Sequence, residues 1–240
     1  MSANPQEFNR GAIRPMECMK SGWALIKGEY WLFLGITVVG ILVGSAVPLG
    51  ILMGPMMCGI YLCLLSRMRG ERIEFGLLFK GFDFFGDALI AALVHVIPIL
   101  AILLPLGFGF SIGLTIFLPQ AGSRRSSYDP SALITFIIAM GVVFVIACVI
   151  VMALSALFMF TYPLIVDRKL SGLEAVKTSA RAVMANFGGV LGLFMLNMLL
   201  SIVGVLFCYV GAFLVMPIGI AAWAIAYRQV FPAPQTYGGL

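Results

Sequence analysis

Two uninterrupted apolar runs, residues 88–118 and 132–162, limit the folds open to this chain more than any other feature of its sequence. Each run has 31 residues and contains no Lys, Arg, Asp or Glu. An apolar stretch of about 18 residues or more is typical of a membrane-crossing helix. As one helix, each run would be roughly 46 Å long, which exceeds a hydrocarbon core of about 30 Å. We therefore expect two long helices that tilt, kink or project, with Pro98 and Pro105 as kinks in the first.

The rest of the chain is nearly as apolar. Of its 240 residues, 62% are hydrophobic and 10% are charged, and the mean hydropathy is +1.09. Because a soluble domain carries roughly 25% charged residues, this composition excludes an ordinary soluble domain, a disordered chain and a disulfide scaffold. We predict an all-α, polytopic integral membrane protein with a single membrane domain over residues 15–228. The flanking segments 1–14 and 229–240 are predicted to be flexible.

About six transmembrane helices fit the apolar segments between the polar or Pro- and Gly-rich breaks. The predicted spans are residues 31–48, 51–67, 88–118, 132–162, 188–205 and 209–227. The sequence leaves open whether 88–118 is one kinked span or a span plus a re-entrant segment. Gly40 and Gly44, four residues apart in the first span, favour close contact with a neighbouring helix.

Three amphipathic helices are expected between these spans, at about residues 15–30, 72–86 and 171–187. Apolar side chains recur in each at the three- and four-residue spacing of a helical stripe. Leu173, Met184 and Phe187 belong to the stripe of the third helix, where Ser171 and Glu174 have the spacing of a capping box. Such helices lie in the membrane interface with the stripe in the acyl boundary.

The distribution of basic residues predicts the topology. With six spans, thirteen of the fifteen Lys and Arg residues fall on the same side as the N-terminus, and only Arg124 and Arg125 fall on the other. This is a strong positive-inside signal. It predicts a multi-pass protein of the bacterial inner (plasma) membrane with both termini in the cytoplasm. The net charge of +5 suits contact with anionic lipid, although the basic bias of cytoplasmic loops is the more ordinary explanation.

The chain also carries a parallel internal repeat. At an offset of 157 residues, Glu17, Lys20, Ser21, Tyr30 and Gly35 match Glu174, Lys177, Thr178, Phe187 and Gly192. At an offset of 162, Pro55, Gly59 and Tyr61 resemble Pro217, Ala221 and Trp223. Each unit would be an interfacial helix followed by a hairpin of spans, and both would start on the same side. Parallel repeats occur in transporters, and they also arise by plain duplication of a hairpin.

Few residues of the chain are candidates for a catalytic, binding or transport role. His95, the only histidine, and Asn197 lie within spans, where each serves either transport or polar packing between helices. The chain shows no serine-nucleophile motif, no metal-ligand spacing and no phosphate-binding loop. We therefore expect no enzyme activity, no metal, no cofactor and no nucleic-acid partner. Asp167 and Glu174 are expected to pair with Arg168, Lys177 or Arg181, or to remain solvated.

The basic residues of the interfacial helices are candidates for contact with lipid headgroups. They are Lys20, Lys27, Arg168, Lys169, Lys177 and Arg181. The favoured hypothesis is a non-enzymatic protein that organises membrane lipids, anionic ones in particular, or a partner protein at the cytoplasmic face. The alternative is a small transporter or channel with a path near His95. A homo-oligomer is compatible with both.

Two loose motifs point to a family. In the second half of the chain, a proline and an acidic residue at the end of a span precede an amphipathic helix with an Ala and a Ser: Pro163, Asp167, Ala175 and Ser179. In the first half, the motif runs from Gly54-Pro55 through Gly59 to Arg69-Gly70 and Gly81-Phe82. Together they resemble a group of uncharacterised bacterial six-span proteins, similar to the membrane domain that accompanies some glycerophosphodiester phosphodiesterases. The resemblance implies the six-span fold and does not imply phosphodiesterase activity.

Overall fold

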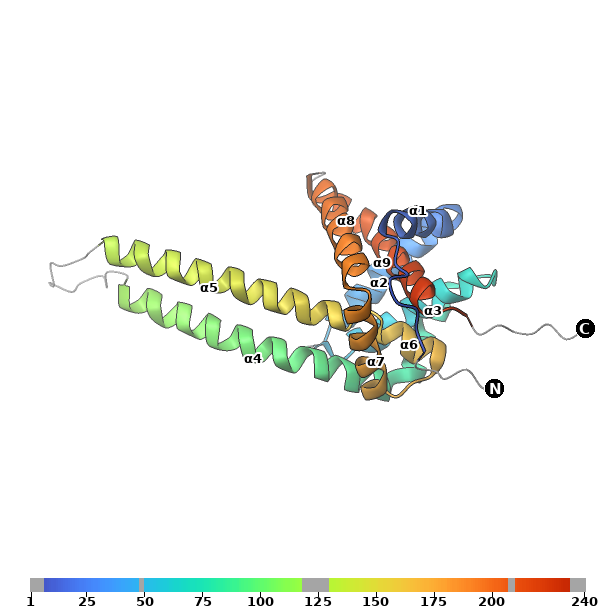
Figure 1. Ribbon diagram of the computed structural model, residues 1–240, viewed down its shortest axis with the longest axis horizontal. Coiled ribbons are helices and arrows are strands. Elements are labelled where there is room, and N and C mark those ends of the chain that lie inside the picture. The colour runs from blue at the N-terminus through green and yellow to red at the C-terminus, as the bar shows by residue number, and fades with distance from the viewer. Residues whose placement is uncertain (1–6, 48–49, 118–129, 207–209, 234–240) are drawn as a thin grey trace, which may run out of the picture. The chain divides into compact units, whose positions relative to one another are not determined.

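The computed structural model describes residues 7–47, 50–117, 130–206 and 210–233, and all regular structure in these ranges is helical (Figure 1). The prediction of an all-α protein is therefore confirmed. Five helices are long and apolar enough to cross a membrane: Pro15–Ser45, Phe75–Ile116, Ser131–Arg168, Phe187–Leu206 and Gly211–Val230. The segment expected as the second of six spans forms a shorter apolar helix, Met53–Met68.

The helices follow one another along the chain as α1 (Pro15–Ile26), the 3-10 turn η1 (Lys27–Glu29), α2 (Tyr30–Ser45), α3 (Met53–Met68), the 3-10 helix η3 (Phe75–Phe84), α4 (Phe85–Phe117), α5 (Pro130–Leu157), α6 (Thr161–Arg168), α7 (Gly172–Ala185), α8 (Phe187–Leu206) and α9 (Val210–Val230). The chain divides into two compact units. The first unit comprises residues 1–93 and 156–240, and the second comprises residues 94–155.

The two long apolar runs fold differently from each other. The first is one continuous helix, α4, which passes through Pro98 and Pro105 without a break. The predicted span 132–162 is wrong at its end, because α5 stops at Leu157 and α6 begins at Thr161. Pro163 explains the break: it has no N–H to donate within a continuous helix, whereas in the first turn of α6 none is needed.

The segment expected as an interfacial α-helix at 72–86 is instead the 3-10 helix η3. Its three-residue period places Leu78 and Gly81 against α3. The contact is between backbones, because a Cβ atom at Gly81 would collide with the carbonyl oxygen of Pro55, and one at Gly59 with that of Leu78. Close packing on α3 therefore overrides the expected helical period.

Small residues bring the helices of the first unit together. Cys18, Gly22 and Ile26 form the buried face of α1. This face packs on α9, where a Cβ atom at Gly22 would lie 2.7 Å from the backbone nitrogen of Ala222. The predicted close contact at Gly40 and Gly44 is confirmed, since both are buried where α2 meets α3.

The ends of the described chain are more ordered than expected. We call residues 7–14, which were predicted to be flexible, the N-terminal strap. The Asn9 N–H donates to the carbonyl oxygen of Val230 (2.8 Å), and Ile13 is buried. Likewise α9 continues to Val230 and Phe231 is buried, although residues 229–240 were expected to be loose. The last carbonyl groups of α9, which have no partner within the helix, accept hydrogen bonds from the strap. Residues 1–6 and 234–240 lie outside the described residues.

Candidate functional site: a polar layer at the helix ends

Polar side chains of the first unit gather where several helices begin or end. Arg67, in the last turn of α3, pairs with Glu29 just before α2 (2.9 Å). Arg69 follows α3 and lies within electrostatic reach of Asp167, at the end of α6. We call this group the polar layer: Glu29, Arg67, Arg69, Asp167, Asn186, Tyr227, Arg228 and Gln229. It joins the start of α2 and of α8 to the ends of α3, α6 and α9.

The carboxylate of Asp167 binds two neighbouring side chains of α9. It accepts two hydrogen bonds from the Arg228 guanidinium, at 2.7 and 2.8 Å, and a third from the Tyr227 hydroxyl at 2.8 Å. The side chains of Asp167 and Arg228 are only 8% and 17% exposed. Such a bidentate, nearly dry pair fixes geometry as well as charge. The expected partners of Asp167 were Arg168, Lys177 or Arg181, and the true one is on α9.

Arg168 makes its contacts within the protein. Its guanidinium donates to the carbonyl oxygen of Glu7 (3.0 Å) and lies over the ring of Phe231, 5.0 Å from its centroid. The other five basic side chains expected at lipid headgroups are exposed: Lys20, Lys27, Lys169, Lys177 and Arg181.

Two amides tie the strap to this layer. The Asn186 side chain accepts from the Ala12 N–H (2.9 Å) and donates to the carbonyl oxygen of Asn9 (3.0 Å). Gln229 accepts from the Arg14 N–H (3.0 Å). Sequence reasoning missed both amides, since each bonds a segment more than 170 positions away and carries no local signal.

The family-like residue Ser179 stabilises the break between α5 and α6. Its hydroxyl donates to the carbonyl oxygen of Leu157 (2.6 Å) and accepts from the N–H of Phe160 (3.1 Å). It thereby satisfies one backbone acceptor and one donor that the break leaves without helical partners. Ser179 therefore stabilises the fold at this break.

The start of α7 is capped from outside the helix. The Asp87 carboxylate accepts from the Gly172 N–H (3.0 Å), while the Ser171 side chain makes no cap bond to the backbone. Instead the Ser171 hydroxyl donates to Glu174 (3.0 Å), so the expected capping box is not formed. Asp87 can approach because Gly172 has no Cβ atom to meet its carbonyl oxygen.

The outward surface of α7 combines apolar and basic side chains. Leu173, Met184 and Phe187, the first residue of α8, are 51%, 63% and 62% exposed. Lys177 and Arg181, one turn apart, are exposed along the edge of this apolar strip. The opposite face, with Ala175 and Ala182 among its residues, is buried in the protein. We call the five exposed residues the α7 surface.

The two polar residues predicted within spans belong to different units. His95 of α4 shares a hydrogen bond with the Ser155 hydroxyl of α5 through its Nε2 (3.1 Å). Asn197 of α8 donates to the carbonyl oxygen of Leu193 (3.0 Å) and lies close to Gly219 of α9. Asn197 thus serves helix packing, whereas His95 and Ser155 form a polar pair in an apolar hairpin.

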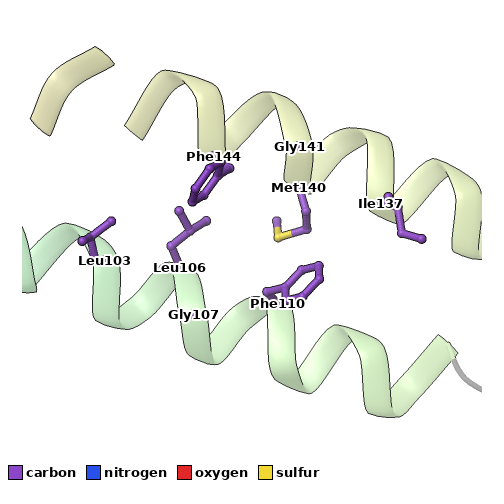
Figure 2. Close-up of a pocket in the computed structure, with 8 residues that line it drawn as sticks. All are labelled: Leu103, Leu106, Gly107, Phe110, Ile137, Met140, Gly141 and Phe144. Atoms are coloured by element: carbon purple, nitrogen blue, oxygen red, sulfur yellow. The ribbon is translucent and has the colours of Figure 1, made fainter. Parts of the chain in front are cut away.

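The second unit also contains an apolar pocket of about 430 Å³ between α4 and α5 (Figure 2). It is lined by Leu103, Leu106, Gly107, Phe110, Ile137, Met140, Gly141 and Phe144. Figure 2 shows the side chains of Leu106, Phe110, Met140 and Phe144 directed into the space between the helices. Its lining offers apolar contact without a charged group.

No group of three or more His, Cys, Asp or Glu side chains in the described ranges could hold a metal ion. At the rim of the polar layer, Arg69 donates to Glu71 (2.6 Å). This bond, with one from Ser66, holds the pKa of the Glu71 carboxyl below its usual value.

Together these features define a class, an all-helical protein with apolar helices able to cross a membrane. Comparison of the chain with protein families, with curated proteins and with solved structures finds no match.

Proposed function

We propose that this chain is a non-enzymatic, multi-pass protein of the bacterial inner membrane that holds anionic lipid at the cytoplasmic face. The observation that carries the proposal is the α7 surface, in which exposed apolar side chains adjoin exposed Lys177 and Arg181. A helix of this kind lies in the interface, with its apolar strip among the acyl chains and its cations at the phosphates. With six spans, thirteen of the fifteen basic residues fall on one side, which supports the cytoplasmic orientation.

The six-span arrangement belongs to the same proposal. α2 and α3 have 16 residues each, about 24 Å of helix. The ion pair between Glu29 and Arg67 joins the start of α2 to the end of α3. This supports a hairpin in which α3 comes back to the level at which α2 begins. A span somewhat shorter than the hydrocarbon core is accommodated at modest cost.

Lipid retention tests the proposed function. The full chain is placed in nanodiscs of equal parts phosphatidylglycerol and phosphatidylcholine, and the lipids that remain bound are identified by native mass spectrometry. We expect phosphatidylglycerol to be retained in preference. Because each basic residue at an anionic surface contributes about 1 kcal/mol, Lys177→Gln with Arg181→Gln weakens the contact at α7 roughly 30-fold.

The matched control is Arg10→Gln, which removes an exposed charge from the strap. Equal retention of the two lipids by the unaltered chain would refute the proposal. Retention by the α7 variant equal to that of the control would remove α7 from it. The same spectra report a second copy or a co-purifying protein.

A second candidate, a small transporter or channel, is favoured by the pair between His95 and Ser155. An ionisable side chain inside an apolar hairpin is a functional hypothesis by default. If it carries solute or protons, His95→Ala abolishes a pH-dependent flux in proteoliposomes, whereas Cys148→Ala, exposed on α5, leaves it intact. Flux no greater than that of empty vesicles would reject transport.

A further inference from the structure

Two pairs of helices begin at equivalent positions. α1 starts at Pro15 and α7 at Gly172, 157 positions later. The helices that follow them, α2 and α8, start at Tyr30 and Phe187, again 157 positions apart. The offset that relates the two sequences therefore also relates the positions at which these helices start.

The same positions face the protein interior in α1 and α7. Cys18 and Ala175 are equivalent at this offset, and both are fully buried. Ile26 and Val183 are likewise equivalent and buried. The two helices thus present the same face to the protein, although α1 packs on α9 and α7 packs on α6.

The same positions also face outward. Met16 and Leu173 are 59% and 51% exposed, and each lies one turn before an exposed lysine, Lys20 or Lys177. Each helix therefore carries an exposed apolar side chain beside an exposed cation. That is the arrangement expected where a lysine stem follows the acyl boundary and its ammonium reaches a lipid phosphate.

Neither lysine forms an ion pair with the carboxylate that precedes it by three residues. Glu17 precedes Lys20 by three residues, and its carboxylate pairs with Arg14 (3.1 Å). Glu174 stands in the equivalent position before Lys177 and accepts from Ser171 (3.0 Å). Both carboxylates are directed to partners at the start of their own helices.

Hydrogen bonds connect the strap to the end of α7. Asn186, immediately after α7, bonds Asn9 and Ala12, which precede α1. Asn186 therefore ties the segment that precedes α1 to the end of α7.

We propose that α1 and α7 are two copies of one lipid-binding surface, each of which binds the phosphate of one anionic phospholipid through its lysine. The inference rests on the proposed function and adds to it a second site and a stoichiometry of two. The occupant is a bilayer lipid, because a cation and an apolar side chain lie together on an exposed surface, where the first can reach a phosphate and the second the acyl chains.

Counting bound lipids tests the number of sites. In phosphatidylglycerol nanodiscs, the full chain is expected to retain two lipids, Lys20→Gln one, Lys177→Gln one, and the double variant none. Arg10→Gln is expected to retain two. The exposed lysines are outside the core, so these variants keep the fold.

The outcomes separate the two proposals. If Lys20→Gln retains as many lipids as the unaltered chain while Lys177→Gln loses one, α1 is not a second copy and the proposed function survives. If the unaltered chain retains no lipid, both fail.

Immersion depth gives an independent readout. Nitroxide labels at Met16→Cys and Leu173→Cys are expected at the same depth below the phosphates, measured from their accessibility to oxygen and to a nickel chelate. A label in water at one position and among acyl chains at the other would overturn the equivalence.

Discussion

The carboxylate of Asp167, at the end of α6, binds Arg228 near the end of α9, 61 positions later in the chain. Asp167→Asn leaves the Arg228 guanidinium nearly buried without its counter-charge. We expect the free energy of unfolding in detergent to fall by about 3 kcal/mol. The control is Glu17→Gln, which breaks an exposed pair and changes stability by less than about 0.5 kcal/mol. Equal stability of the two variants would contradict this assignment.

Ser179 gives a second prediction for a single residue. In Ser179→Ala, the Leu157 carbonyl and the Phe160 N–H lose their side-chain partner at the break between α5 and α6. The cost is expected to be about 1–3 kcal/mol in the same unfolding measurement. Ser201→Ala, at an exposed position of α8, should have no effect. A Ser179 variant as stable as the Ser201 variant would show that the bridge is dispensable.

The pair of Arg69 and Glu71 sets a pH dependence. The folded-state pKa of Glu71 lies below its unfolded value, so the pair stabilises the fold above the unfolded pKa. This contribution disappears as the pH falls through the folded pKa. Both side chains are about half exposed, so the effect is small. In a carboxylate NMR titration, Arg69→Ala should raise the Glu71 pKa towards its usual value, and an unchanged pKa would disprove the cause.

Residues in local patterns could be predicted, and residues with distant partners could not. Lys20 and Lys177 stand out because an amphipathic helix is a periodic pattern within some fifteen residues. The partner of Asp167 is invisible in sequence, since several basic residues were equally plausible and the packing of α6 on the neighbouring helices selects Arg228. Ser155, the partner of His95, was missed for the same reason.

At the scale of helices and their contacts, the close approach of α3 and η3 makes Gly59 sensitive. Gly59→Ala places a Cβ atom against the Leu78 carbonyl, where backbone has to move. We expect a loss of about 1–3 kcal/mol in the free energy of unfolding. Gly107→Ala adds a Cβ atom in open space on α4 and is the control. A Gly59 variant as stable as this control would contradict the contact.

The same helices show what sequence can predict of the elements. Apolar runs mark α2, α4, α8 and α9, because the burial of backbone polar groups in lipid demands helices. The break after α5 and the 3-10 form of η3 depend on Pro163, Ser179 and the contact with α3. These features depend on tertiary contacts, which the periodicity of the sequence alone does not reveal.

On the scale of the whole molecule, the proposed six-span arrangement depends on two hairpins of helices that begin and end at the polar layer. α2 and α3 meet there through Glu29 and Arg67, and the strap brings Asn186 to the same layer. If α3 crosses the membrane, four spans separate α1 from α7, and both helices face the same leaflet. If α3 does not cross, three spans separate them, and they face opposite leaflets.

The most direct test of this account is the side from which α1 and α7 can be labelled. Single cysteines at the equivalent positions Glu17→Cys and Glu174→Cys, in a background without native cysteines, are treated with a membrane-impermeant maleimide. The reagent is applied to spheroplasts and to inverted membrane vesicles. The account predicts that both cysteines react in inverted vesicles and neither in spheroplasts. Labelling of the two positions from opposite sides would contradict the six-span arrangement and the paired lipid surfaces together.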